Sequence, residues 1–402
     1  MAVVPSAVTA GPPPGPSKPG QRIDALDVLR GLAVLGMIIV HFHQRLGLDV
    51  TGAEDLIGWG VWILIEQKSW GAFAFLFGVG FALFLRGLER RGTPVVPIYL
   101  RRLLALAAFG VVTEVAFGFN ILFAYACWGL VLLLVRRWRS GALLALALVA
   151  VCARPLAVWW TGGPIPPANP TLMSAVARAA ESADYLPLLS ARWALFVARL
   201  PDTWPELLPD HNLALFIVGL LAMRHGVIDD PLRHRRVILG WMACGFFAWI
   251  TWWVVVRPVA DRADPATAAL VGGLGLLGDQ WLCFTYIGAG LLLLASRPWL
   301  TRRLAPFGQA GRMALTNYIA QVVIVDLLAS GYGAALKLRP LLYLPAAVLL
   351  FAVLALASRA WLARYRMGPL EWAWRRVTYG CAEDRMRSME QGRAEGARQR
   401  TS

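Results

Sequence analysis

The sequence predicts an all-α fold, a polytopic integral membrane bundle of about ten transmembrane helices with both termini in the cytoplasm. Composition is the first observation: 58% of the 402 residues are hydrophobic and 16% are charged, whereas soluble domains carry about 25% charged residues. The second is a series of apolar runs, most of them close to the roughly 20 residues that cross a bilayer. These runs occupy residues 29–43, 69–86, 99–118, 121–135, 141–160, 212–223, 237–256, 267–296, 312–330 and 341–363.

The third observation is the distribution of lysine and arginine. If the chain begins in the cytoplasm, the loops assigned to that side and the tail after Arg364 hold most of the basic residues, and the opposite loops hold few. This alternation is the positive-inside bias of membrane proteins. The net charge of +15 therefore reflects topology. The lipid bilayer is the expected partner, and nucleic-acid binding is not expected.

The two ends of the chain differ from its apolar middle. Residues 1–21 are rich in proline and glycine, which predicts a disordered cytoplasmic lead. Residues 22–380 form one predicted helical membrane domain, and residues 381–402 form a basic cytoplasmic tail. Charged residues at the start of the first apolar run also argue against a cleaved signal peptide.

Three segments between the runs have features of their own. Residues 56–70, LIGWGVWILIEQKSW, predict a short interfacial helix on the outer side, where tryptophan is enriched. The longest outer connection, 161–211, contains an amphipathic stretch that we expect on the membrane surface. The run at 267–296 is long and contains Gly-Asp-Gln at 278–280. This predicts one span from about Gln280, preceded by a bent or partly re-entrant segment.

The first span carries a polar stripe. At about 100° per residue, Asp27, Arg30 and His41 fall on one helical face. Arg30 and His41 are eleven residues apart, or about 16 Å along the axis at 1.5 Å per residue. Asp27 lies one turn before Arg30 and can pair with it. His43 faces elsewhere.

Two interpretations of this stripe remain open. In the first, Arg30 is an anchor at the membrane interface and His41 ends the span at the other interface. In the second, the stripe is a functional site, because ionisable residues within membrane spans are costly and often functional. An arginine can hold a phosphate, and a histidine can act as a general base. Gly31 and Gly36 on the same helix would allow a close helix neighbour.

The stretch RIDALDVLRGLAVLGMIIVHF at residues 22–42 resembles the first helix of the transmembrane acyltransferase superfamily. Arg30 and His41 match the spacing of an arginine and a histidine in its bacterial polysaccharide O-acyltransferases. Further stretches resemble one branch of it, the YeiB-type family (domain of unknown function 418): EQKSWGAFAFLFGVGFAL (66–83), FGFNILFAYACWGLVLLL (117–134), FGQAGRMALTNYIAQ (307–321) and GPLEWAWRRVTYG (368–380).

The resemblance implies the fold and acyl transfer. It places the YeiB-type C-terminal part at about 220–380 and the protein in the bacterial cytoplasmic (inner) membrane. Two positions depart from the family pattern. Many YeiB-type proteins have asparagine where this chain has His41, and Asn120 stands where the family has an acid in a Gly-Asp-Ile-Leu sequence.

Other polar residues in or beside the spans are further candidates. Glu114 and Asn120 flank a short outer hairpin, and they belong either to a pocket with His41 or to ordinary hairpin solvation. Arg312 lies near the cytoplasmic end of its run. Asn317 and Gln321 share one helical face, where amides either join helices or contact a substrate.

The leading expectation is a membrane acyltransferase that uses cytoplasmic acyl-CoA as its donor substrate. Arg30, Asp27 and Arg312 would bind the donor, His41 would be catalytic, and Glu114, Asn120, Asn317 and Gln321 would form a supporting polar pocket. The acceptor would be a hydroxyl or amine of a cell-envelope glycan, a lipid-linked intermediate or a secondary metabolite. No metal is expected, because no metal-ligand spacing occurs. A transporter or exporter of a small molecule or lipid, or a non-catalytic subunit of an envelope complex, are the alternatives.

Overall fold

A computed structural model describes residues 19–48, 50–52, 55–160, 169–207, 211–262 and 264–380. The predicted lead and basic tail therefore lie largely outside the described residues. The first helix begins at Pro19, so the last residues of the predicted lead, 19–21, are helical. The described residues form helices joined by turns and loops, with one isolated β-bridge between Gly47 and Leu338, which confirms the all-α prediction.

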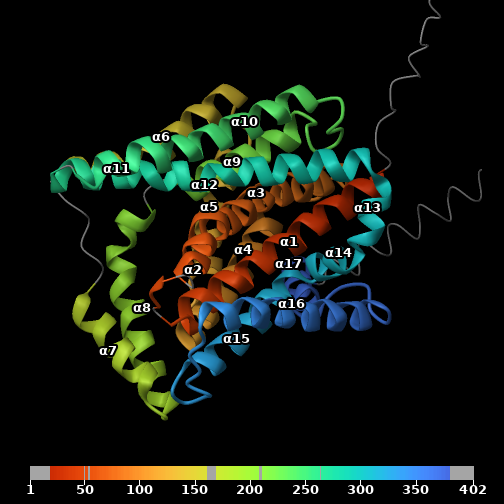
Figure 1. Ribbon diagram of the computed structural model, residues 1–402. Coiled ribbons are helices and arrows are strands. Elements are labelled where there is room, and N and C mark those ends of the chain that lie inside the picture. Colours follow the sequence, from red (N-terminus) through yellow and green to blue (C-terminus); the bar gives the residue numbers. More distant parts are fainter. Residues whose placement is uncertain are drawn as a thin grey trace, which may run out of the picture.

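Figure 1 labels most of the helices of the bundle. Two further elements, η2 and η3, are π-helical segments, whose hydrogen bonds span one residue more than those of an α-helix. In chain order the elements are α1 (Pro19–Leu46), α2 (Asp55–Val61), η2 (Trp62–Glu66), α3 (Gln67–Arg90), α4 (Val95–Phe117), α5 (Ile121–Val135), α6 (Ser140–Trp160), α7 (Pro170–Glu181), α8 (Tyr185–Leu207), α9 (His211–Arg224), α10 (Arg235–Thr251), η3 (Trp252–Val256), α11 (Arg257–Ala260), α12 (Pro265–Ser296), α13 (Pro298–Arg303), α14 (Ala305–Arg312), α15 (Ala314–Ala329), α16 (Pro340–Leu362) and α17 (Pro369–Tyr379).

Several of these helices are long and apolar enough to cross a membrane. Among the described residues, five helices pass on length and composition: Asp24–Leu46, Leu56–Arg90, Val95–Phe117, Arg235–Ala260 and Pro340–Leu362. The pair α14 and α15 makes a sixth if its two parts, bent by 85°, form one span. The apolar helices α5 and α9 have 15 and 14 residues, which at 1.5 Å per residue fall short of a hydrocarbon core about 30 Å thick. The protein is a helical membrane protein, and the count of ten spans and the cytoplasmic termini stay predictions.

The prediction of a break at residues 278–280 is wrong. α12 runs without interruption from Pro265 to Ser296. Asp279 accepts hydrogen bonds from Lys68 Nζ at 2.8 Å and Trp253 Nε1 at 3.0 Å, and a Cβ on Gly278 would lie 2.4 Å from Trp252 Cβ. The polar residues and the glycine thus make contacts between neighbouring helices. The sharp bend lies instead after Arg312, between α14 and α15.

The prediction of a short interfacial helix at residues 56–70 is also wrong. This segment is the first part of a helix that continues from Leu56 to Arg90 through η2 and α3. Lys68 is 1% exposed, because its ammonium group pairs with Asp279 inside the bundle. The pairing removes the reason for Lys68 to stay at an aqueous surface.

α1 lies at the centre of the bundle, where it packs against α3, α14, α15 and α16 (Figure 1). A Cβ on Gly31 would lie 2.0 Å from the carbonyl oxygen of Phe307, and a Cβ on Gly36 would lie 2.1 Å from Ser69 Oγ. The expectation that these glycines admit close neighbours is confirmed. They allow α14 and α3 to cross the helix that carries Arg30 and His41.

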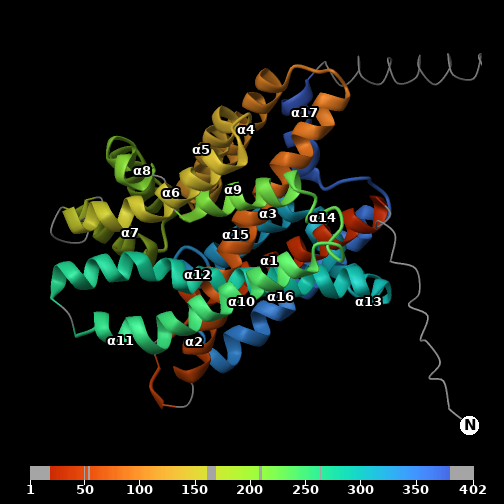
Figure 2. The same cartoon turned by 90° about the horizontal axis from the view of Figure 1, so that it is seen from above.

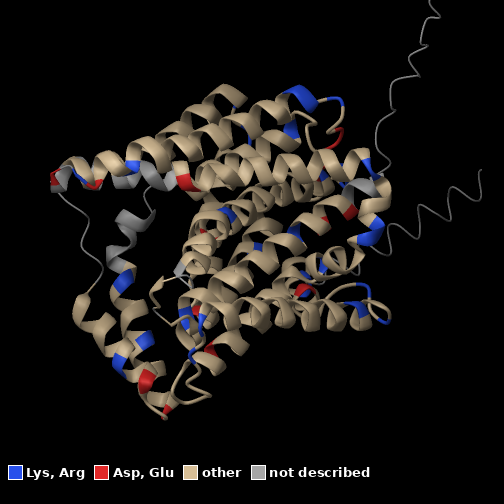
Figure 3. Cartoon of the chain, in the orientation of Figure 1, with Lys and Arg blue, Asp and Glu red and all other residues tan. Residues whose placement is uncertain are grey.

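The bundle has two ends relative to α1, which we call the Arg30 end and the His41 end after the residues that lie toward them. α4 and α5 are side by side, and α7 and α8 form a hairpin that packs on α4 toward the His41 end (Figures 1 and 2). The predicted amphipathic stretch within 161–211 is therefore helical. Most of the ribbon carries no charge, and many of its lysines and arginines lie near the edges of the molecule (Figure 3).

Candidate functional site

A cavity of about 300 Å³ lies between α1, α3, α4, α5, α15 and α17. Three arginines line it: Arg30 of α1, Arg102 of α4 and Arg312 at the end of α14. The rest of its wall is mainly apolar and aromatic. The cavity extends along α1 from Arg30 as far as Met37. One end of the cavity is therefore cationic, and its interior is suited to a hydrocarbon chain.

Arg30 is oriented into this cavity while it pairs with its own helix. Its Nη1 donates to Asp27 Oδ1 at 2.6 Å, as the helical phase predicts. Asp27 is 5% exposed, whereas the side chain of Arg30 is 27% exposed and faces Gly80 across the cavity. The pair thus lowers the cost of holding a guanidinium group in an apolar bundle and leaves part of that group accessible.

Arg312 and Arg102 reach the same cavity from other helices. Arg312 donates to the carbonyl oxygen of Arg366 at 3.0 Å, which fixes its orientation. The guanidinium carbon of Arg102 lies 3.6 Å from the centre of the Trp374 ring, and Trp374 Nε1 donates to the Arg102 carbonyl at 2.8 Å. Sequence reasoning missed Arg102, because it counted this residue only among the basic residues of a loop.

Glu371 of α17 also lines the cavity, but its carboxylate is hydrogen-bonded to the start of α15. It accepts hydrogen bonds from the backbone of Leu315 at 2.8 Å and of Thr316 at 3.0 Å, and from Thr316 Oγ1 at 2.5 Å. These bonds cap the N-terminus of α15, where a negative charge is stabilising. α17 therefore holds the helix that begins at the bend, and the cationic character of the cavity end remains.

His41 lies beyond the cavity. Its side chain is 3% exposed, and its ring centre is 4.4 Å from that of Phe119 and 6.1 Å from that of Tyr318. Tyr318 lines the cavity, whereas His41 does not. The predicted stripe is present, but its two functional ends do not share one cavity, because the side chain of Tyr318 lies between the cavity and His41.

Several buried polar atoms around this site have no hydrogen-bond partner within the described chain. They are His41 Nδ1, Tyr318 Oη, Tyr99 Oη and both amide atoms of Gln321. Leaving such an atom unpaired costs about 1–3 kcal/mol, so each needs a physical reason. Tyr99 and Tyr318 both line the cavity, and the hydroxyl oxygen of each is itself buried.

None of the four residues of the predicted supporting pocket lines the cavity. Glu114 accepts from Arg199 Nη1 of α8 at 3.4 Å, and Asn120 is exposed at the start of α5. Asn317 Nδ2 donates at 2.9 Å both to the Ala310 carbonyl and to Ser358 Oγ, so it joins α14, α15 and α16. Of the two alternatives for the amides, the structural one describes Asn317.

Two family models match the chain in succession. Residues 22–196 match the model described as "Heparan-alpha-glucosaminide N-acetyltransferase, catalytic". Residues 222–381 match the model described as "Protein of unknown function (DUF418)". The first match includes Arg30, His41 and Arg102, and the second includes Arg312 and Tyr318, so the cavity is built from both.

Full-length relatives agree with these matches. The chain is 27% identical to "Uncharacterized protein YxaH" of Bacillus subtilis (strain 168), over 90% of this chain and 96% of the relative. It is 26% identical to "Uncharacterized protein YeiB" of Escherichia coli (strain K12), over 90% of this chain and 97% of the relative. The resemblance to the YeiB-type family is confirmed. No solved structure matches this chain.

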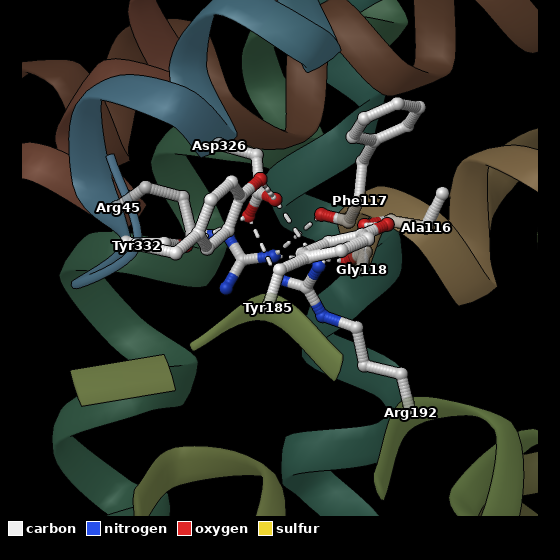
Figure 4. A network of polar contacts seen from close by, with 9 residues as sticks. Arg45, Ala116, Phe117, Gly118, Tyr185, Arg192, Asp326 and Tyr332 are labelled. Atoms are coloured by element: carbon white, nitrogen blue, oxygen red, sulfur yellow. Dashed lines mark hydrogen bonds and ion pairs between the residues drawn. The ribbon is translucent and has the colours of Figure 1, made fainter. Parts of the chain in front are cut away.

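A second polar cluster lies at the His41 end, shown in Figure 4. Arg192 of α8 is paired with Asp326 of α15 at 2.7 Å, and their side chains are 3% and 1% exposed. Tyr332 Oη donates to Asp326 at 2.7 Å. Partial burial and this hydrogen bond raise the pKa of Tyr332, which keeps its hydroxyl protonated as a donor.

The same cluster holds the loop that covers His41. Arg192 Nη1 donates to the Ala116 carbonyl at 2.6 Å, and Arg45 Nη2 donates to the carbonyls of Phe117 at 3.2 Å and Gly118 at 3.1 Å (Figure 4). The ring of the next residue, Phe119, contacts the His41 ring, and the guanidinium carbon of Arg45 lies 4.8 Å from the centre of the Phe119 ring. The α7–α8 hairpin is therefore tied to the cover over His41.

Sequence reasoning passed over this cluster because its members come from distant segments. Asp326 was the available signal, since a carboxylate within the apolar run 312–330 is costly unless it is paired. Lys68 and Asp279 form a comparable buried pair between α3 and α12. Among the described residues, no group of three or more His, Cys, Asp or Glu side chains could hold a metal ion.

Proposed function

We propose that this YeiB-type protein is a membrane acyltransferase that moves an acyl group from cytoplasmic acyl-CoA to a hydroxyl or amine of an acceptor. The observation that carries the proposal is the cavity with three arginines at one end and an apolar interior that reaches Tyr318, the neighbour of His41. The match of residues 22–196 to the catalytic part of an N-acetyltransferase supports acyl transfer.

The cationic end suits the phosphates of the donor. Guanidinium groups bind phosphate oxygens through paired N–H donors, and Arg30, Arg102 and Arg312 provide three of them from different helices. The cavity volume of about 300 Å³ lies at the small end of ligand sites, which span about 300–1,000 Å³. It therefore fits the narrow pantetheine arm and the acyl group, while the nucleotide stays at the arginines.

The interior supplies groups for the transfer itself. The unpaired hydroxyl of Tyr318 would donate a hydrogen bond to the thioester oxygen as it becomes negative. His41 would accept the proton of the attacking hydroxyl or amine. The new acyl–oxygen or acyl–nitrogen bond forms as the carbon–sulfur bond breaks, and the electron pair leaves with the sulfur as the CoA thiolate, which then takes up a proton.

The acceptor would approach from the His41 end. Phe119 and the loop that carries it cover His41 there, under the contacts of α8 and Arg45. Access for an acceptor therefore requires this cover to move, whereas the donor reaches the cavity from the Arg30 end. Donor and acceptor would meet at Tyr318 and His41, after entering from the Arg30 end and the His41 end respectively.

The proposal is tested with purified protein in lipid nanodiscs supplied with labelled acyl-CoA. We expect saturable consumption of the thioester, and we expect Arg30→Gln to raise KM by about tenfold or more, because a charged hydrogen bond to phosphate contributes about 1.5–3 kcal/mol. Arg90→Gln is the matched control, since Arg90 is exposed and does not line the cavity.

Two outcomes would contradict the proposal. Absence of any saturable acyl-CoA consumption would leave no basis for an acyltransferase. Substrate flux through reconstituted vesicles without thioester consumption would favour the transporter or exporter, and neither activity would favour the non-catalytic subunit. An equal change of KM in Arg30→Gln and Arg90→Gln would remove Arg30 from the donor site.

A further inference from the structure

A second hollow lies on the other side of α1. It has a volume of about 240 Å³ and lies between α1, η2, α3 and α12. Its wall is apolar except for Lys68, Ser69 and Tyr286. Leu32, Leu64 and Tyr286 at its rim are 40%, 44% and 45% exposed, so the groove opens toward the outside of the bundle. We call it the α12 groove.

Leu76 of α3 separates this groove from the arginine-lined cavity. It is the one described residue that lines both hollows, and it is 3% exposed. On the groove side its neighbours along the wall include Ala33 and Ala72, which have small side chains. Shortening the side chain of Leu76 would therefore leave few side-chain atoms between the two hollows.

The passage is confined to the level of Leu76 by the way α1 meets α3. Farther along α1, Gly36 brings the two helices so close that a Cβ there would lie 2.1 Å from Ser69 Oγ. Met37, on the next position of α1, lines the cavity, whereas Gly36 lines the groove. At the level of Gly36 the packed helices α1 and α3 thus form the wall between the two hollows. At the level of Leu76 the side chain of Leu76 fills the opening.

We propose that Leu76 sets the longest acyl chain that the donor cavity accepts, and that the native donor carries a short acyl group. This inference rests on the proposed acyl-CoA-dependent function. The apolar interior has room for the pantetheine arm and a few carbons, and a longer chain meets Leu76. Without that side chain, the hydrocarbon chain of a longer donor would continue into the α12 groove, whose apolar wall suits it.

The test compares acetyl-, octanoyl- and palmitoyl-CoA with the wild type and two variants, Leu76→Val and Leu76→Ala, in nanodiscs. We expect kcat/KM of the wild type to fall by about tenfold or more from acetyl to octanoyl, because even one misplaced methylene changes discrimination by roughly 10–200-fold. Leu76→Ala should reduce or reverse this ratio, and Leu76→Val should give an intermediate value. The milder variant keeps the test informative if the alanine variant is unstable.

Two leucines provide matched controls. Leu106 of α4 is equally buried, at 2%, and lines only the cavity. Leu32 lines only the groove. Leu106→Ala removes the same volume as Leu76→Ala without opening the wall, and Leu32→Ala widens the groove without joining it. Neither should give the gain of octanoyl and palmitoyl transfer that Leu76→Ala gives.

The outcomes are distinct. A wild type that uses octanoyl-CoA as well as acetyl-CoA would overturn the inference while the proposed function stands. So would a Leu106→Ala variant whose chain-length profile matches that of Leu76→Ala. A wild type and a Leu76→Ala variant that both fail to consume any acyl-CoA would overturn the proposed function and the inference with it.

Discussion

Tyr318 connects the two parts of the proposed site at the scale of a single residue. It lines the cavity, its ring lies 6.1 Å from that of His41, and its buried hydroxyl has no partner within the described chain. Neither Arg30 nor His41 alone occupies such a position. Its hydroxyl is therefore the group we expect to respond most strongly to the charge that develops on the thioester.

The residue-scale prediction concerns this hydroxyl and the imidazole beside it. Tyr318→Phe should lower kcat by about 10²–10³-fold with little change in KM, because it removes one donor to the developing negative charge and keeps the ring. His41→Ala should abolish transfer and leave membrane insertion and folding intact. Initial rates with labelled acyl-CoA and an acceptor, together with thermal unfolding of each variant, measure these effects.

Tyr99→Phe is the control for this prediction. Tyr99 also lines the cavity with an unpaired hydroxyl, but it has no ring contact with His41. A loss of kcat in Tyr99→Phe equal to that in Tyr318→Phe would assign the effect to the cavity in general. Full activity of His41→Ala would exclude His41 as the base.

Some single residues could be predicted from the sequence because the reason is local. The pairing of Asp27 with Arg30 follows from helical phase alone, and the close contacts at Gly31 and Gly36 follow from the absence of a side chain on glycine. Arg102 and Tyr318 could not be found in this way. Their importance depends on which helices pack around α1, and nothing in their own segments distinguishes them from other residues of a span.

At the scale of elements, a buried ion pair helps to join the α7–α8 hairpin to the bundle. Arg192 of α8 and Asp326 of α15 are 2.7 Å apart and almost fully buried. Removing one partner of such a pair leaves an uncompensated buried charge, which costs about 3–5 kcal/mol, while replacing both by apolar residues is often close to neutral. The pair therefore determines how firmly α8 holds the cover over His41.

The element-scale prediction follows from this asymmetry. Asp326→Leu should lower the free energy of unfolding by about 3–5 kcal/mol, and the double variant with Arg192→Met should recover most of the loss. Denaturant unfolding in detergent, monitored by tryptophan fluorescence, gives both values. A single variant as stable as the wild type, or a double variant no more stable than the single, would show that the ion pair does not contribute to stability in this way.

The elements also show where sequence patterns mislead. Gly-Asp-Gln at 278–280 has the composition of a break, yet α12 passes through it, because Lys68 and Trp253 satisfy Asp279. The actual bend after Arg312 has no proline at its centre, and it depends on Glu371 from a distant segment to cap α15. A capping partner 56 residues away leaves no local signal.

At the scale of the whole molecule, hydropathy predicts the fold class well. In a bilayer the backbone must satisfy its own hydrogen bonds, so long apolar runs become helices. It does not predict which helices enclose a cavity, because lipid and protein surroundings are equally apolar. The cationic end of the cavity emerges only when α1, α4 and α14 bring their arginines together.

The central claim is that donor and acceptor reach the site from opposite ends of the bundle, with acyl-CoA on the cytoplasmic side. Sealed membrane vesicles of the two orientations test it most directly. Labelled acyl-CoA added outside should be consumed saturably by inverted vesicles, and by right-side-out vesicles only after they are permeabilised. Consumption by intact right-side-out vesicles, or none in inverted ones, would contradict the account.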